Sequence, residues 1–179
     1  MKVICFGDSN TYGYDPRSYF GGRYDAHNRW VDILAEQTGW TVCNQGENGR
    51  GVPRTPVPFP ADTDLLILML GSNDLLQGWR PEAVADLLER FLTGLSLPRD
   101  KLLLIAPPPI VPGAWVAGQE QIADTIAYAR CCRALASRLG IRFADAGAWG
   151  VTMAYDGVHF TEAGHRAFAA GLCASIRSW

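Results

Sequence analysis

Short apolar runs alternate with amphipathic stretches along this chain. Three of the runs are almost entirely hydrophobic and are bounded by turn-forming residues: Val3–Phe6, Leu65–Leu70 and Leu102–Ala106. Strands that are covered by helices on both faces have this pattern, because neither face of the strand meets water. Two weaker strands are predicted at Thr41–Cys43 and Ile141–Ala144. The pattern therefore predicts a parallel sheet of about five strands.

Helical patterns lie between these runs. They cover Asn28–Gln37, Pro81–Leu97, Ala117–Leu139 and Thr161–Ile176. The second is the clearest, since its apolar positions recur at helical spacing and Pro81 stands in its first turn. The alternating order of strands and helices predicts an open, doubly wound α/β fold, a three-layer α/β/α sandwich. The proline-rich stretch Val52–Pro60 predicts an extended connection before the third strand.

Length, composition and charge narrow the class of protein. The 179 residues suit a single domain that covers 1–179. Sixteen basic and 18 acidic residues give a net charge of -2, without a run of like charges, which argues against a nucleic-acid partner. The longest obvious apolar run has six residues, far short of a membrane span, and the first apolar run is shorter than a secretory signal. Five cysteines without CxxC spacing are typical of reduced thiols. We therefore expect a soluble, cytoplasmic protein without a membrane partner.

Candidate chemistry lies where the strands end, since ligands of open α/β sheets bind outside the carboxyl ends of the strands. Ser9 follows the first strand, but a serine is nucleophilic only when a base takes its proton. Asp156 and His159 stand three residues apart near the other end, so the carboxylate can orient the imidazole as that base. Either segment alone could also be a simple turn. The GxSxG elbow is absent, because Gly7 fills its first position but Thr11 its last, which disfavours an α/β-hydrolase.

Two further loops offer hydrogen-bond donors for an oxyanion. The glycine-rich segment Asn44–Gly51 presents backbone N–H groups, and Asn73 places a side-chain amide just after the most apolar strand. A glycine-rich loop can also hold a phosphate, but GxxxxGK[ST] and GxGxxG are both missing. Acyl transfer is therefore better supported than phosphate binding.

Together the four segments resemble a known family. FGDSNTYG, NQGENG, LGSND and DGVHFTEAGH stand in the order and approximate spacing of the four blocks of the SGNH hydrolases, also called GDSL esterases and lipases. Within that family the chain is most similar to bacterial arylesterases and acyltransferases. The resemblance implies a flavodoxin-like SGNH hydrolase fold, a small-molecule ester as substrate, and neither a cofactor nor a metal.

By position, the resemblance implies a role for each matching residue. Ser9 matches the nucleophile, and its own N–H matches one oxyanion donor. Gly49 matches the backbone donor of the second block, and Asn73 the side-chain donor of the third. His159 matches the general base and Asp156 the acid that orients it.

Other residues near the nucleophile carry weaker expectations. Asp8 is expected to organise the loop rather than to carry a proton. Asn10 stands where the eponymous GDSL motif has leucine, and we expect it to alter the wall of the pocket. The same pocket could be lined by five apolar residues on loops at the carboxyl edge: Trp79, Ile110, Trp115, Tyr155 and Phe160.

The sequence thus predicts a serine esterase that hydrolyses short, acetyl-type esters through an acyl-enzyme on Ser9, with transfer of the acyl group to alcohols as a second outcome. A carbohydrate O-deacetylase that uses the same residues is an alternative. An alternative of another class is a flavodoxin-like module in which Ser9 and its neighbours hold a phosphate or flavin, but it leaves Asn73 and His159 without a role. The oligomeric state stays open, and a homo-oligomer is compatible with the sequence.

Overall fold

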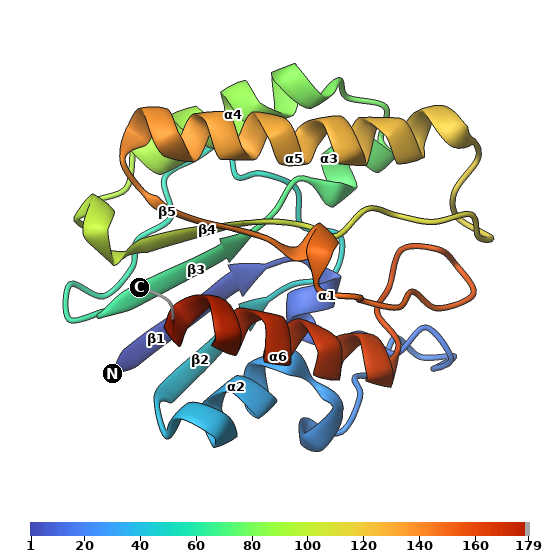
Figure 1. Cartoon of the computed structure of the whole chain (residues 1–179), viewed down its shortest axis with the longest axis horizontal. Helices are drawn as coiled ribbons and strands as arrows, with labels where there is room; N and C mark the ends of the chain where they lie inside the picture. Colours follow the sequence, from blue (N-terminus) through green and yellow to red (C-terminus); the bar gives the residue numbers. More distant parts are fainter. Residues whose placement is uncertain (178–179) are drawn as a thin grey trace.

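The computed structural model describes residues 1–177, and its centre is a five-stranded parallel sheet (Figure 1). The strands are β1 (Lys2–Gly7), β2 (Thr41–Gly46), β3 (Leu65–Met69), β4 (Leu102–Ala106) and β5 (Arg142–Asp145). Their order in the sheet is β2-β1-β3-β4-β5, and every neighbouring pair is parallel. This is the flavodoxin-like doubly wound order. All five predicted strands are confirmed.

Four long helices cover the two faces of the sheet. Those helices are α2 (Trp30–Thr38), α4 (Pro81–Thr93), α5 (Gln119–Leu139) and α6 (Glu162–Arg177). Figure 1 shows α4 and α5 above the sheet and α2 and α6 below it. Shorter elements join them: α1 (Ser9–Tyr12), α3 (Ser72–Leu76) and 3-10 turns at Ala26–Asn28, Arg99–Lys101 and Ala146–Ala148. The predicted three-layer α/β/α sandwich is confirmed.

The core consists of two apolar layers, one on each face of the sheet. Along β3, Leu66 and Leu68 pack toward α4 and α5, while Leu65 and Ile67 pack toward α2 and α6. Every residue of β3 and β4 is buried, as the unbroken apolar runs predicted. None of the described helices is long and apolar enough to cross a membrane.

Local differences from the prediction have simple physical causes. The helix predicted over Pro81–Leu97 ends earlier, at Thr93, and Gly94 caps it with a backbone N–H that donates to the carbonyls of Arg90 and Phe91. Leu97 is still buried against the same core, so the apolar period continues after the helix has ended. The helices α1 and α3 were not predicted, since elements of four and five residues are too short to show a period.

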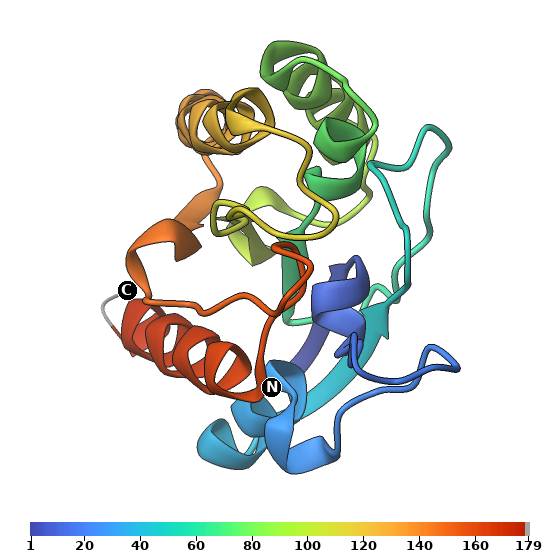
Figure 2. The same cartoon turned by 90° about the vertical axis from the view of Figure 1, so that its right-hand side faces the viewer.

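The topology brings the candidate loops together. The strand order changes direction between β1 and β3, and at such a point the loops that follow the two strands diverge and leave a crevice. The helix α1 follows β1 and the helix α3 follows β3. Figure 2 looks onto this edge of the sheet and shows α1 beside the loop that leads into α6.

Candidate active site

Ser9 begins α1 directly after β1. Asp8 caps the helix, because its Oδ1 accepts the N–H of Asn10 at 2.9 Å and its carbonyl accepts the N–H groups of Thr11 and Tyr12. Burial raises the pKa of Asp8 to about 6, although these N–H groups oppose the shift. The carboxyl of Asp8 therefore holds the turn that presents Ser9.

A glycine on the neighbouring strand lets this turn lie close to the sheet. A Cβ on Gly46 would stand 2.0 Å from the backbone nitrogen of Tyr12. No other residue fits at Gly46 unless α1 moves away from β2. Ser9 is therefore positioned by a backbone contact as well as by the cap on Asp8.

The side chains of Ser9, His159 and Asp156 form a continuous line of hydrogen bonds. The Nε2 atom of His159 lies 3.0 Å from the Oγ atom of Ser9, and its Nδ1 atom lies 2.8 Å from the Oδ2 atom of Asp156. The Oδ1 atom of Asp156 accepts the backbone N–H groups of Val158 and His159 at 2.8 and 2.9 Å. The structure thus brings together three residues that the sequence places at opposite ends of the chain.

The charge of Asp156 is favoured by these contacts. Burial alone would raise the pKa of Asp156, but the hydrogen bonds from His159 and Val158 outweigh burial and lower it below the ordinary value. A carboxylate on Nδ1 keeps the proton there, so that Nε2 is free to accept the proton of Ser9. The arrangement can therefore generate an alkoxide-like nucleophile and stabilise the imidazolium that forms.

Asn73 and Gly49 line the same cavity as Ser9. Asn73, in α3, donates one Nδ2 hydrogen to the carbonyl of Arg50 at 3.0 Å, and an amide nitrogen has a second hydrogen to offer. Gly49 has a φ of +75°, and the space where its side chain would stand is open. Two donors thus border the same cavity as Ser9, as an oxyanion site requires.

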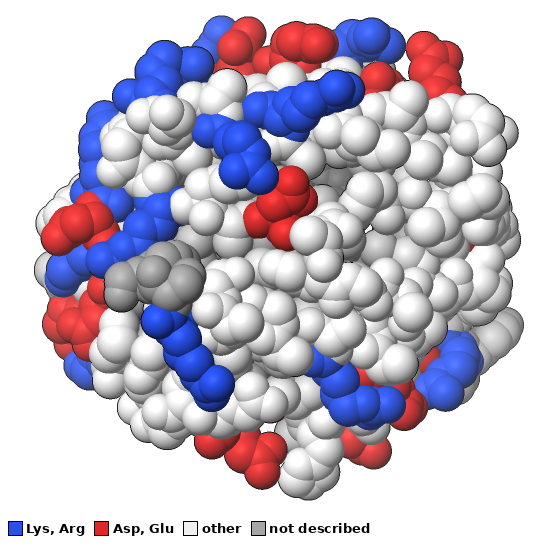
Figure 3. All heavy atoms as spheres, in the orientation of Figure 1, with Lys and Arg blue, Asp and Glu red and all other residues white. Residues whose placement is uncertain are grey.

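These groups line a cavity of about 430 Å³. Its lining residues are Ser9, Tyr14, Asn48, Gly49, Asn73, Leu76, Trp115, Val158 and His159. No Asp, Glu, Lys or Arg is among them. Figure 3 shows that charged side chains are also sparse over the right-hand part of the surface in that view, on the side toward which the strands point in Figure 1. The cavity therefore suits an uncharged molecule.

Two aromatic rings contact the imidazole of His159. The ring of Tyr14 lies 4.6 Å from it in a tilted arrangement, and Trp115 meets it edge-on at 5.1 Å. The backbone N–H of Trp115 also donates to the carbonyl of Asp156 at 3.0 Å. Of the five apolar residues expected to line the pocket, only Trp115 does so, and its side chain remains 54% exposed.

The structure places the other expected pocket residues outside this cavity. Phe160 is fully buried in the core against Phe168, because the ring points to the face of the sheet that α6 covers. Ile110 is also buried and lines no part of the cavity. Tyr155 is exposed, and its hydroxyl donates to the carbonyl of Pro16 at 3.1 Å, outside the cavity.

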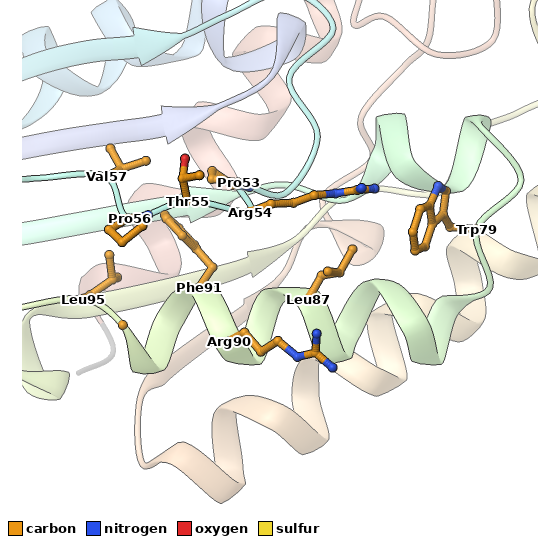
Figure 4. Close-up of a pocket in the computed structure, with 11 residues that line it drawn as sticks. Pro53, Arg54, Thr55, Pro56, Val57, Trp79, Leu87, Arg90, Phe91 and Leu95 are labelled. Carbon is orange, nitrogen blue, oxygen red and sulfur yellow. The ribbon is translucent and has the colours of Figure 1, made fainter.

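Trp79 lies at a different cavity, of about 530 Å³, between the segment 53–57 and α4 (Figure 4). In Figure 4 the side chain of Arg54 extends toward Trp79, and its guanidinium lies 4.8 Å from the ring. The two cavities share no lining residue. Asn10 does not line the cavity of Ser9 either, because its side chain is hydrogen-bonded to the backbone of residues 158 and 160.

Arg50 is a residue of the site that the sequence did not reveal. Its guanidinium donates to the carbonyls of Gly7 and Gln45, at the ends of two neighbouring strands, and lies over the ring of Phe6. Its own carbonyl accepts the hydrogen bond from Asn73. Arg50 stands beside Gly49 in a glycine-rich loop, and that position could have marked it as a residue of the site. The carbonyls that it contacts depend on how the strands pair, which the sequence does not show.

Comparison with known proteins identifies the family. The model of the GDSL-like lipase/acylhydrolase family matches residues 5–167. The chain belongs to this family. The resemblance to SGNH hydrolases is thereby confirmed, and this GDSL family member is a serine esterase, a carboxylic ester hydrolase. The reading as a flavodoxin-like binding module is set aside.

Solved structures of similar proteins support the same assignment. A candidate arylesterase from Agrobacterium tumefaciens is 32% identical with a TM-score of 0.82, and the match covers 99% of this chain and 98% of that one. The aryl esterase of M. smegmatis is 28% identical over the same shares, with a TM-score of 0.82. A carbohydrate acetylesterase family member from Sinorhizobium meliloti is 26% identical over 99% and 97%, with a TM-score of 0.82. No curated protein matches the chain.

Proposed function

We propose that the chain is a single SGNH hydrolase domain in which Ser9 is the nucleophile, His159 the general base and Asp156 the acid that orients it. The observation that carries the proposal is the unbroken line of hydrogen bonds from the Ser9 hydroxyl through His159 to Asp156. Ser9 and His159 border a cavity that also has amide donors. Nucleophile, base, orienting acid and oxyanion donors are the four parts that acyl transfer needs.

The reaction proceeds in two halves. His159 takes the proton of Ser9 as the hydroxyl attacks the ester carbonyl, and the N–H groups of Ser9 and Gly49 and the amide of Asn73 hold the oxyanion. His159 then protonates the leaving alcohol, which leaves an acyl group on Ser9. Water, activated by His159, releases the acid. An alcohol in place of water would accept the acyl group instead.

The substrate we propose is an uncharged ester with a short acyl group and a soluble alcohol or phenol. The cavity of about 430 Å³ holds no charged side chain except His159 when it is protonated, and Trp115 offers it an aromatic wall. An aryl esterase is among the similar structures. Trp115, which lines the cavity, is 54% exposed, so we expect the site to be open to water.

A series of p-nitrophenyl esters tests the length of the acyl group. We expect kcat/KM to be highest for acetate or butyrate and to fall as the chain grows, because the cavity is open beside the half-exposed Trp115 and the added methylene groups would stay in contact with water. Initial rates at equal substrate concentration, below the micelle-forming range, provide the measurement. A maximum at ten carbons or more would overturn the short-chain proposal.

A carbohydrate O-deacetylase is a second candidate, because one of the similar structures is a carbohydrate acetylesterase family member. The amides of Asn48 and Asn73 give the cavity hydrogen-bonding groups that a sugar could use. Acetylated monosaccharides and phenyl acetate, compared by kcat/KM on the same preparation, separate the two candidates. A higher kcat/KM on the sugar esters would favour the deacetylase.

A fluorophosphonate probe followed by peptide mapping tests the chemistry directly. We expect the label on Ser9, since this hydroxyl alone among the described residues has an imidazole nitrogen within hydrogen-bond distance. His159→Ala should lose the label because nothing then takes the proton. An unlabelled Ser9 in folded wild-type protein would count against the proposed nucleophile.

Asn73→Ala tests the oxyanion site. The loss of one donor costs about 3 to 4 kcal/mol of barrier, so we expect kcat on p-nitrophenyl acetate to fall on the order of 10²- to 10³-fold. KM should change much less, because the donor acts mainly in the transition state. Asn48→Ala is the matched control, since Asn48 lines the same cavity without being assigned as a donor. Equal losses in the two variants would contradict the assignment of Asn73.

A further inference from the structure

The side chain of Asn10 makes a hydrogen bond on each side of His159. Its Nδ2 atom donates to the carbonyl of Val158 at 3.1 Å, and its Oδ1 atom accepts the N–H of Phe160 at 2.9 Å. Asn10 is only 6% exposed, so both bonds form away from water. One side chain next to the nucleophile therefore brackets the residue that serves as its base.

The direction of this side chain is set by other contacts. The backbone N–H of Asn10 donates to Asp8, and its carbonyl accepts the indole N–H of Trp30 at 2.9 Å. The backbone of Asn10 is thus fixed whichever side chain it carries. A substitution at Asn10 removes the two bonds to the loop without removing what holds α1 in place.

Few other contacts fix the loop relative to α1. Within the described chain, the only other hydrogen bond between α1 and residues 158–160 is the one from Ser9 to His159. The other contacts of the His159 side chain are a hydrogen bond from Nδ1 to Asp156, in the same loop, and ring contacts with Tyr14 and Trp115. Asn10 therefore supplies two of the three hydrogen bonds that join α1 to residues 158–160 in the described chain.

We propose that Asn10 is a positioning residue that holds His159 at hydrogen-bond distance from Ser9 while the imidazole gains and loses its proton. The leucine of the GDSL motif could form neither bond, so this chain fixes its base in a way that the motif itself does not provide. The inference rests on the proposed roles of Ser9 and His159. It also replaces the expectation that Asn10 shapes the wall of the pocket.

Asn10→Leu and Asn10→Ala test the proposal. A base displaced by a fraction of an ångström to one ångström costs about 10- to 100-fold, and we expect this loss in kcat on p-nitrophenyl acetate, with KM within about twofold. The rate of fluorophosphonate labelling of Ser9 should fall by a similar factor, because labelling needs the same proton transfer. Both rates are measured well below the unfolding temperature of each variant.

Asn44→Leu is the matched control. Asn44 also donates to one backbone carbonyl, that of Thr11 in α1, and accepts one backbone N–H, that of Gly46, but it does not touch the loop of His159. Leucine at Asn44 also leaves two backbone groups without partners, so its loss of free energy of unfolding, measured beside that of Asn10→Leu, gives the structural cost of losing such a pair of bonds. The loss of kcat should be larger for Asn10→Leu.

Two results would overturn the inference. One is that Asn10→Leu keeps kcat and the labelling rate within about twofold of the wild type. The other is that Asn10→Leu and Asn44→Leu lose activity in the same proportion to their loss of stability, which would make Asn10 an ordinary structural residue. Failure of the proposed function looks different, because Ser9→Ala would then still hydrolyse the ester.

Discussion

Replacing Ser9 with alanine is expected to reduce the hydrolysis of p-nitrophenyl acetate on the order of 10⁴- to 10⁶-fold, to the background that the oxyanion donors alone provide. The reason is that no acyl-enzyme can form without the hydroxyl, and His159 is then left without the group it activates at 3.0 Å. Ser9→Ala removes only the hydroxyl oxygen, so we expect the fold to stay intact. The measurement is kcat on purified protein whose circular dichroism and melting temperature match the wild type.

Ser72→Ala is the matched control for this experiment. Ser72 begins α3 directly after Leu70 and Gly71, as Ser9 begins α1 after β1. Its side chain is equally buried, but it does not line the cavity of Ser9. Its removal should leave kcat near the wild-type value. Should Ser9→Ala retain more than roughly one hundredth of wild-type turnover, another nucleophile would have to be sought.

The residues that meet at the candidate active site could be picked out from the sequence because each belongs to a short local arrangement. Asp156 and His159 need only a three-residue turn to meet, and this turn is present, with backbone N–H groups on the carboxylate. Ser9 and Asn73 follow strands that can be predicted from their apolar runs. Because the carboxyl ends of parallel strands lie at one edge of the sheet, these two residues are expected to lie near each other. Only their proximity to His159 required the structure.

The walls of the cavity could not be predicted in the same way. His159 and Phe160 are neighbours, yet the imidazole faces the cavity while the phenyl ring enters the core beside Phe168. The direction of a side chain in a loop depends on long-range contacts, such as the bond from the N–H of Phe160 to Asn10. Tyr14 lies just after α1, which is too short to show a period in the sequence.

The contacts of Arg50 and Asn10 were hidden from the sequence for a related reason. Both act on backbone atoms of segments far away in the chain: Arg50 on the carbonyl of Gly7, and Asn10 on residues 158 and 160. A backbone acceptor carries no mark in the sequence, whereas a side-chain partner does. Residues that position a site through contacts with distant backbone atoms can therefore be recognised only from the structure.

Replacing Asp156 with asparagine is expected to lower kcat about 10⁴-fold while the loop keeps its shape. The N–H groups of Val158 and His159 both need an acceptor, so the amide oxygen takes the place of Oδ1 and the amide nitrogen faces Nδ1 of His159. An N–H donor at that place makes Nδ1 the acceptor and moves the ring proton to Nε2. The nitrogen that should take the proton of Ser9 then already carries one.

Asp8→Asn distinguishes this effect from the simple loss of a buried charge near Ser9. Asparagine is as good a helix cap as aspartate, and it retains an acceptor for the N–H of Asn10. Asp8 forms no hydrogen bond with the ring of His159, so Asp8→Asn should lower kcat far less than Asp156→Asn.

NMR provides a second measurement. The signal of the Nδ1 proton of His159 should disappear in Asp156→Asn and persist in Asp8→Asn. A loss of less than about tenfold in Asp156→Asn would show that the tautomer of His159 is set by something other than Asp156.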